Sequence, residues 1–132
     1  MKKGCTINMK KLNQYMRKAI IAQFMENGNM SVFAEEIAKK LKDKTDIEFI
    51  PSANRTSIAL TSTTYKNVSN NTVISAITEA VISCIEQDED FETDLIEGYG
   101  FSYDGSMITD DLVRDCIDLS VSGKYIQFDF DI

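Results

Sequence analysis

The chain has 132 residues, of which 43% are hydrophobic and 27% charged, values typical of a single soluble globular domain with an ordinary core. Its formal net charge of −7 and sequence pI of about 4.5 argue against general binding to DNA, RNA or anionic lipid, which require a net basic surface. Histidine is absent, which removes the commonest general base and the usual metal ligand. We therefore expect no enzyme activity, no metal site and no cofactor.

The charge is divided by position along the chain. Residues 1–44 hold ten Lys or Arg and four Asp or Glu, a balance of +6. Residues 45–132 hold four Lys or Arg and seventeen Asp or Glu, a balance of −13. Surface fields of one sign select partners and steer their approach, so this asymmetry favours a binding role.

The cysteines indicate the compartment. Cys5, Cys84 and Cys116 are odd in number, widely spaced and without a C-x-x-C motif, which indicates reduced thiols in a cytoplasmic protein. The apolar stretches are too short or too interrupted to span a membrane, and no apolar run follows Lys2 and Lys3 as in a secretory signal. We therefore expect no membrane partner.

The start of the chain predicts a helix after an unstructured segment. Residues 1–8 have no periodicity and are expected to be disordered, ahead of a single domain over residues 9–132. From Met9 to Phe24 the apolar side chains recur at helical spacing, and Asn27-Gly28 predicts the end of that helix.

A second helix is expected directly after this break. Asn29 or Ser31 is its predicted cap, and Phe33, Ile37 and Leu41 share one face. The short link predicts an antiparallel or angled pair of N-terminal helices.

The period then changes to that of strands. Residues 46–51 and 56–65 are rich in β-branched and apolar side chains, and Ser52–Arg55 lies between them as a turn, which predicts a hairpin. Residues 72–87 return to helical spacing. The five acids among residues 88–94 predict an exposed loop.

Residues 95–103 predict a strand with Tyr99, Phe101 and Tyr103 on one face. Asp104-Gly105 is a typical hairpin turn. The segment that begins at Thr109 predicts a short helix with that threonine as its cap.

Alternating apolar and polar residues over 117–132 predict a C-terminal hairpin. With Ser122-Gly123 as its turn, Leu119 would lie opposite Ile126. The complete order of elements predicts an α+β fold, in which an antiparallel sheet built from hairpins has helices packed on one face and the chain begins with a helix pair.

The acids of the later part of the chain carry the leading functional hypothesis. Those of the C-terminal strands would project from one sheet face and, together with the acidic loop, form a negative docking surface for a basic protein. We expect a non-enzymatic cytosolic protein that acts by protein–protein contact, as an inhibitor, an immunity factor or an anti-defence protein of a mobile element. A solvated face whose charge prevents aggregation is the structural alternative. The candidate residues are Asp88, Glu89, Asp90, Asp118, Asp129 and Asp131, with Tyr99 or Tyr103 as an anchor.

Two other binding roles stay open. Opposite charges on the two parts of the chain favour head-to-tail self-association, and such a homo-oligomer could hold a nucleotide or another small ligand at its interface. Residues 35–41 are similar to the first helix of many helix-turn-helix DNA readers, and basic side chains decorate both N-terminal helices. A DNA-binding regulator would require a recognition helix to follow, where residues 46–50 predict a strand.

Overall fold

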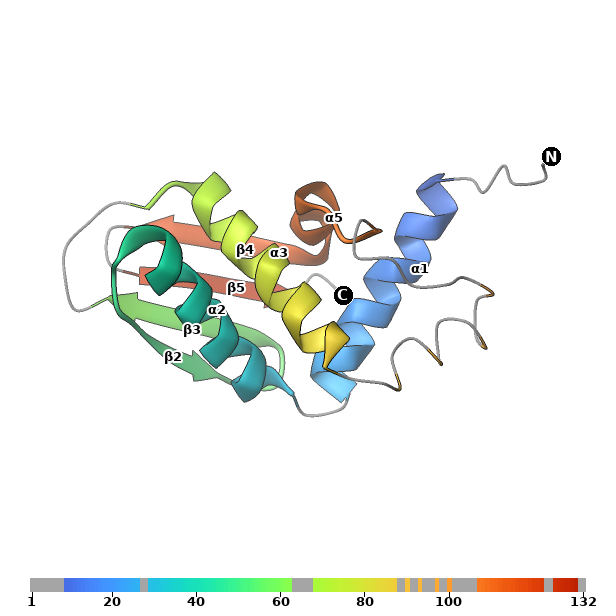
Figure 1. Cartoon of the computed structure of the whole chain (residues 1–132), viewed down its shortest axis with the longest axis horizontal. Coiled ribbons are helices and arrows are strands. Elements are labelled where there is room, and N and C mark those ends of the chain that lie inside the picture. Colours follow the sequence, from blue (N-terminus) through green and yellow to red (C-terminus); the bar gives the residue numbers. More distant parts are fainter. Residues whose placement is uncertain are drawn as a thin grey trace.

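The computed structural model describes residues 9–26, 29–62, 68–87, 107–122 and 125–130, together with Asp90, Thr93, Glu97 and Gly100. Within these residues the elements follow one another along the chain as Figure 1 shows. They are α1 (Met9–Ile21), the π-helix η1 (Ala22–Glu26), α2 (Met30–Thr45), β2 (Phe49–Ala53), β3 (Ser57–Ser62), α3 (Asn70–Glu86), α5 (Asp110–Cys116), β4 (Ile117–Ser122) and β5 (Tyr125–Phe130).

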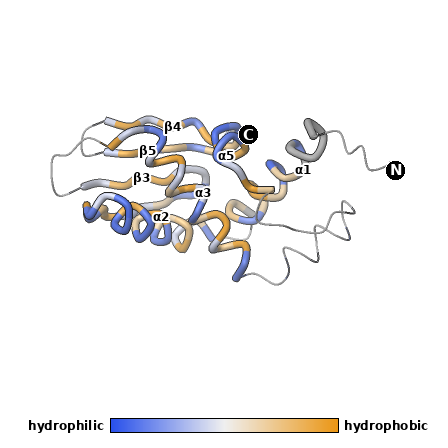
Figure 2. The backbone as a smooth tube through the Cα atoms, turned by 45° about the horizontal axis from the view of Figure 1, so that its top comes forward, coloured by the Kyte–Doolittle hydropathy of each residue, from blue (hydrophilic) through white to orange (hydrophobic). Residues whose placement is uncertain are grey.

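The described strands form one four-stranded sheet in the order β2-β3-β5-β4, and every neighbouring pair is antiparallel. Helices α2 and α3 pack against each other and lie across one face of this sheet (Figure 1). Figure 2, turned by 45° from this view, also shows α2 and α3 on one side of the strands. The α+β prediction, with an antiparallel sheet and helices on one face, is confirmed.

An aromatic cluster joins the helices to the centre of the sheet. The rings of Phe24 from η1 and Phe33 from α2 are stacked with centroids 4.1 Å apart. Phe33 also meets Phe128 of β5 edge to face at 6.0 Å, and Phe130 stacks at 6.2 Å from Phe33. All four side chains are buried, so this cluster anchors the helical layer to the sheet.

The C-terminal hairpin has the predicted faces but a different register. Leu119 lies opposite Phe128 rather than Ile126, and Ser122 pairs with Tyr125. Ser122 is therefore part of the paired strand and not of the turn. A shift of two residues keeps every side chain on its face, so the apolar pattern does not distinguish the two registers.

Side-chain caps fix the start of two helices. The Thr109 hydroxyl accepts a hydrogen bond from the Leu112 N–H at 3.2 Å, which confirms the predicted cap of α5. Ser69 caps α3 in the same way through the Thr72 N–H at 3.1 Å, so α3 begins two residues before the predicted start. Asn29 precedes α2 without capping it by its side chain.

Two further predictions concern the segments around these elements. Strand β2 follows α2 directly, so a strand and not a recognition helix comes after residues 35–41. In the strand predicted over residues 95–103, Glu97 has helical backbone geometry, and at this residue the prediction is wrong. Apart from Gly100, the rest of that segment lies outside the described residues, as do residues 1–8.

Candidate functional site

The sheet face opposite the helices, which we call the outer face, carries mainly small and polar side chains. The cross-strand pairs assign its members, because directly opposed residues point to the same side. Two large side chains stand out there: Ile50 is 60% exposed and Tyr125 is 41% exposed. The outer face consists of Ile50, Ser52, Ser57, Ala59, Thr61, Asp118, Ser120, Ser122, Tyr125, Gln127 and Asp129.

Two of the predicted site residues form a like-charged pair on the outer face. Asp118 of β4 lies directly opposite Asp129 of β5, and both side chains are exposed. Like charges in this relation repel, because opposed Cβ atoms are only about 5 Å apart. Within the described part of the chain, neither carboxylate has a hydrogen bond or an ion pair. Among the described residues, this negative pair therefore has no counter-charge.

The lysines of α2 make their ion pairs within the helical layer. Lys44 pairs with Glu79 and so joins α2 to α3. Lys40 lies 3.8 Å from Glu36, a neighbour on its own helix. Lys42 contacts two further acids at 3.5 Å, both close to the end of that helix. Among the described residues, the positive charge of the first third therefore does not neutralise the outer face.

Of the other predicted site residues, the structure describes Asp90, which lies away from this pair. Asp90 is exposed and borders a pocket lined by helical residues. Tyr125, which was not among the predicted site residues, is on the outer face, and its hydroxyl donates a hydrogen bond to Gln127 Oε1 at 3.2 Å. The alternation that placed Asp129 outward also places Tyr125 outward, so the signal was present. Five candidates lie outside the described residues: Asp88, Glu89, Tyr99, Tyr103 and Asp131.

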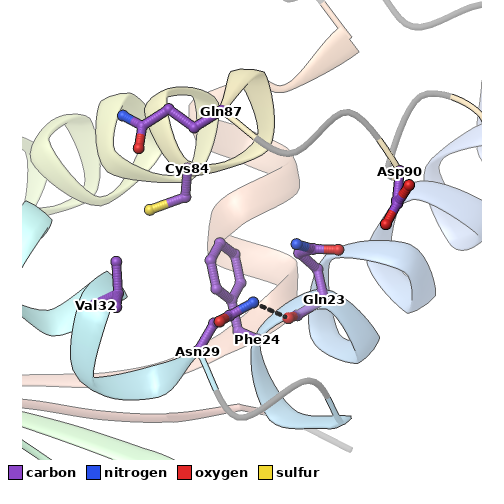
Figure 3. Close-up of a pocket in the computed structure, with 7 residues that line it drawn as sticks. All are labelled: Gln23, Phe24, Asn29, Val32, Cys84, Gln87 and Asp90. Carbon is purple, nitrogen blue, oxygen red and sulfur yellow. Dashed lines mark hydrogen bonds between the residues drawn. The ribbon is translucent and has the colours of Figure 1, made fainter.

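A pocket of about 470 Å³ lies where η1, the start of α2 and the end of α3 meet (Figure 3). The Asn29 amide donates a hydrogen bond to the Gln23 carbonyl oxygen at 3.2 Å and so joins two sides of the pocket. No sequence motif predicted it, because three separate segments, one of them a π-helical turn, come together to create it. Its lining is Gln23, Phe24, Asn29, Val32, Cys84, Gln87 and Asp90.

The thiol in this pocket is a weak nucleophile. Burial, together with the nearby Glu36 carboxylate, raises the pKa of Cys84 to about 11. At neutral pH the side chain is therefore a protonated thiol, whereas nucleophilic attack requires the thiolate. The three carboxamides of Gln23, Asn29 and Gln87 can both donate and accept hydrogen bonds, which suits a neutral polar ligand.

The described residues offer neither a metal-binding cluster nor a membrane-spanning helix. No group of three Asp, Glu or Cys side chains in that part of the chain is arranged to hold a metal ion. No helix there has the length and apolar character needed to cross a membrane.

Comparison with known proteins gives no family. No protein-family model matches the chain, and no curated protein or solved structure matches it either.

Proposed function

We propose that this protein is a non-enzymatic binding protein whose outer face docks on a basic surface of another protein. The observation that carries the proposal is the exposed pair formed by Asp118 and Asp129, directly opposed and without a cation among the described residues. Native sequences that keep a locally unfavourable arrangement tend to do so at functional sites.

A cationic side chain placed between these carboxylates would turn a repulsion into an attraction. Because the repulsion exists only in the free protein, its relief adds to the affinity for a basic partner. The net charge of −7 would also accelerate the encounter with such a partner at low ionic strength.

The rest of the outer face suits contact with a macromolecule. Ile50 and Tyr125 lie in one row across the sheet, with Thr61 between them. They are large and exposed, so the two side chains can act as apolar anchors on the same face as the acidic pair, at the other end of β5 from Asp129. An inhibitor of the immunity or anti-defence type would use such a face to occupy a basic groove of its target.

The test is affinity capture from a lysate of the native host, with the partner identified and then purified. The acidic pair is removed in the double variant Asp118→Asn/Asp129→Asn. The matched control, Asp43→Asn/Glu86→Gln, removes two exposed acids from α2 and α3 and changes the net charge equally. The proposal predicts a partner bound by the wild type and by the control but lost with the outer-face variant. Equal retention by both variants would contradict it.

The pocket favours a second candidate function, the binding of a small polar ligand. Its volume of about 470 Å³ falls in the range of ligand sites, and its carboxamides could read the edge of a nucleobase. A thermal-shift screen with nucleosides and nucleotides tests this function, with Gln23→Ala as the variant expected to lose the shift. A panel that leaves the melting temperature unchanged would contradict it.

A further inference from the structure

The two edges of the sheet differ in what they offer to another strand. The edge strands of the described sheet are β2 and β4. An edge strand presents backbone N–H and C=O groups that lack a partner within the sheet, and a further strand can pair with them. Which residues present these groups follows from the hydrogen bonds that the inner strands make.

The edge formed by β2 is interrupted. The Asn54 N–H donates to the Ser57 carbonyl, so position 54 faces β3. Backbone groups alternate in direction along a strand. The backbone groups of Phe49, Pro51 and Ala53 therefore point away from β3, toward the free edge of the sheet. Pro51 has no N–H, so the middle of this edge lacks a donor.

The edge formed by β4 is not interrupted in this way. The Phe130 N–H donates a hydrogen bond to the Thr56 carbonyl on the β3 side. The backbone groups of Asp129 and Gln127 therefore point to β4. The backbone groups of their partners in β4, Asp118 and Ser120, point back toward β5. The groups of Leu119 and Val121 therefore point to the free edge, and both residues retain an N–H.

The side chains of β4 point to the same opening. Leu119 and Val121 are only half-buried, whereas Phe128 and Ile126, which lie opposite them in β5, are each 1% exposed. The principal neighbours of β4 among the described elements are β5 and the preceding helix α5. An additional strand would cover the exposed part of these apolar side chains.

We propose that β4 receives an extended, basic segment of the partner protein as a fifth, antiparallel strand. This inference rests on the proposed function and specifies the form of the partner. On the outer face, a lysine or arginine would lie opposite Asp118 and close to Asp129. On the helix side, apolar residues would lie opposite Leu119 and Val121. The recognised segment therefore alternates basic and apolar residues.

Charge favours this occupant over a second copy of the same chain. A second β4 strand would bring another Asp118 to the acidic outer face, next to a pair that already repels. A basic strand reverses the sign of that interaction.

Two methylated peptides test the strand addition on the unmodified protein. The probe is a short fluorescent peptide that alternates lysine and valine, and its binding is followed by fluorescence anisotropy. In an antiparallel addition the residue opposite Leu119 exchanges both backbone hydrogen bonds with it, so the valine amides face β4 and the lysine amides face solvent. N-methylation of the valine amides should weaken binding by roughly tenfold or more, the effect of about one lost hydrogen bond. N-methylation of the lysine amides should leave binding unchanged, and equal effects of the two methylations would overturn the inference.

Variants of the protein separate this inference from the proposed function. Leu119→Pro removes an N–H from the free edge without removing one from the β4–β5 ladder, and circular dichroism checks that the variant folds. The inference predicts that this variant loses the peptide. If Leu119→Pro binds the peptide normally while Asp118→Asn/Asp129→Asn does not, the edge inference fails and the acidic-face proposal stands. If Asp118→Asn/Asp129→Asn binds normally while Leu119→Pro does not, strand addition stands and the acidic-face proposal fails.

Discussion

Asp118 and Asp129 lie directly opposite each other across the β4–β5 ladder, on the outer face of the sheet. Both are exposed, and no described side chain provides a counter-charge. The free protein therefore contains a local repulsion that replacement of either residue by asparagine would remove.

The first prediction concerns this repulsion. Asp118→Asn should stabilise the free protein by about 0.5 kcal/mol, because it removes a directly opposed like charge. Urea unfolding at low salt measures the change. Added salt should reduce the gain, since exposed charges are screened. A variant that is less stable than the wild type at low salt would contradict the arrangement.

The second prediction concerns the start of α5. Thr109→Ala should destabilise the protein by about 1 kcal/mol, because the Leu112 N–H loses its acceptor. Thr109→Ser keeps the hydroxyl and should cost much less. Thermal unfolding of the two variants compares them directly, and equal losses would exclude a capping role.

The third prediction concerns the aromatic cluster. Phe33→Ala should cost about 3–5 kcal/mol, because the buried ring stacks on Phe24 and also contacts Phe128. Such a loss is a large part of the stability of an ordinary domain. Chemical denaturation gives the value, and a loss below about 1 kcal/mol would mean that the site repacks.

The fourth prediction concerns alkaline pH. Burial raises the pKa of Cys116 from 9.0 to about 12, although Arg17 partly opposes this shift. The folded state therefore holds this proton more tightly than the unfolded state does. The resulting stability is complete below pH 9.0 and is lost as the pH rises toward 12.

Cys116→Ala isolates that contribution from the other groups that titrate at high pH. Below pH 9.0 the variant should be the less stable protein, because it leaves a small cavity. Above that pH the difference between the two free energies of unfolding should narrow. If the two free energies of unfolding stay a constant distance apart as the pH rises, the assigned pKa of Cys116 is contradicted.

The hairpins illustrate what sequence patterns can determine. Alternation correctly placed Asp118 and Asp129 on the exposed side of the C-terminal hairpin, because each strand buries one side. It did not determine the register, since a shift of two residues leaves Leu119 on the same face.

Other features depended on contacts between distant segments. The π-helical turn at Ala22–Glu26 has no local signal in the sequence. It brings Phe24 onto Phe33 and helps to form the pocket beside Cys84. The acidic loop residues were expected to join the outer face, but Asp90 borders that pocket instead. Sequence alone therefore predicted that Asp118 and Asp129 share one face, but neither their direct pairing nor the position of Asp90.

The central claim is that the position of the acids, and not the net charge alone, creates the binding surface. The most direct measurement is the association rate of the purified partner at increasing ionic strength. At low salt, Asp118→Asn/Asp129→Asn should bind roughly tenfold more slowly than the wild type, and Asp43→Asn/Glu86→Gln, which loses the same net charge elsewhere, should slow binding much less. Equal rates for the two double variants would contradict the claim.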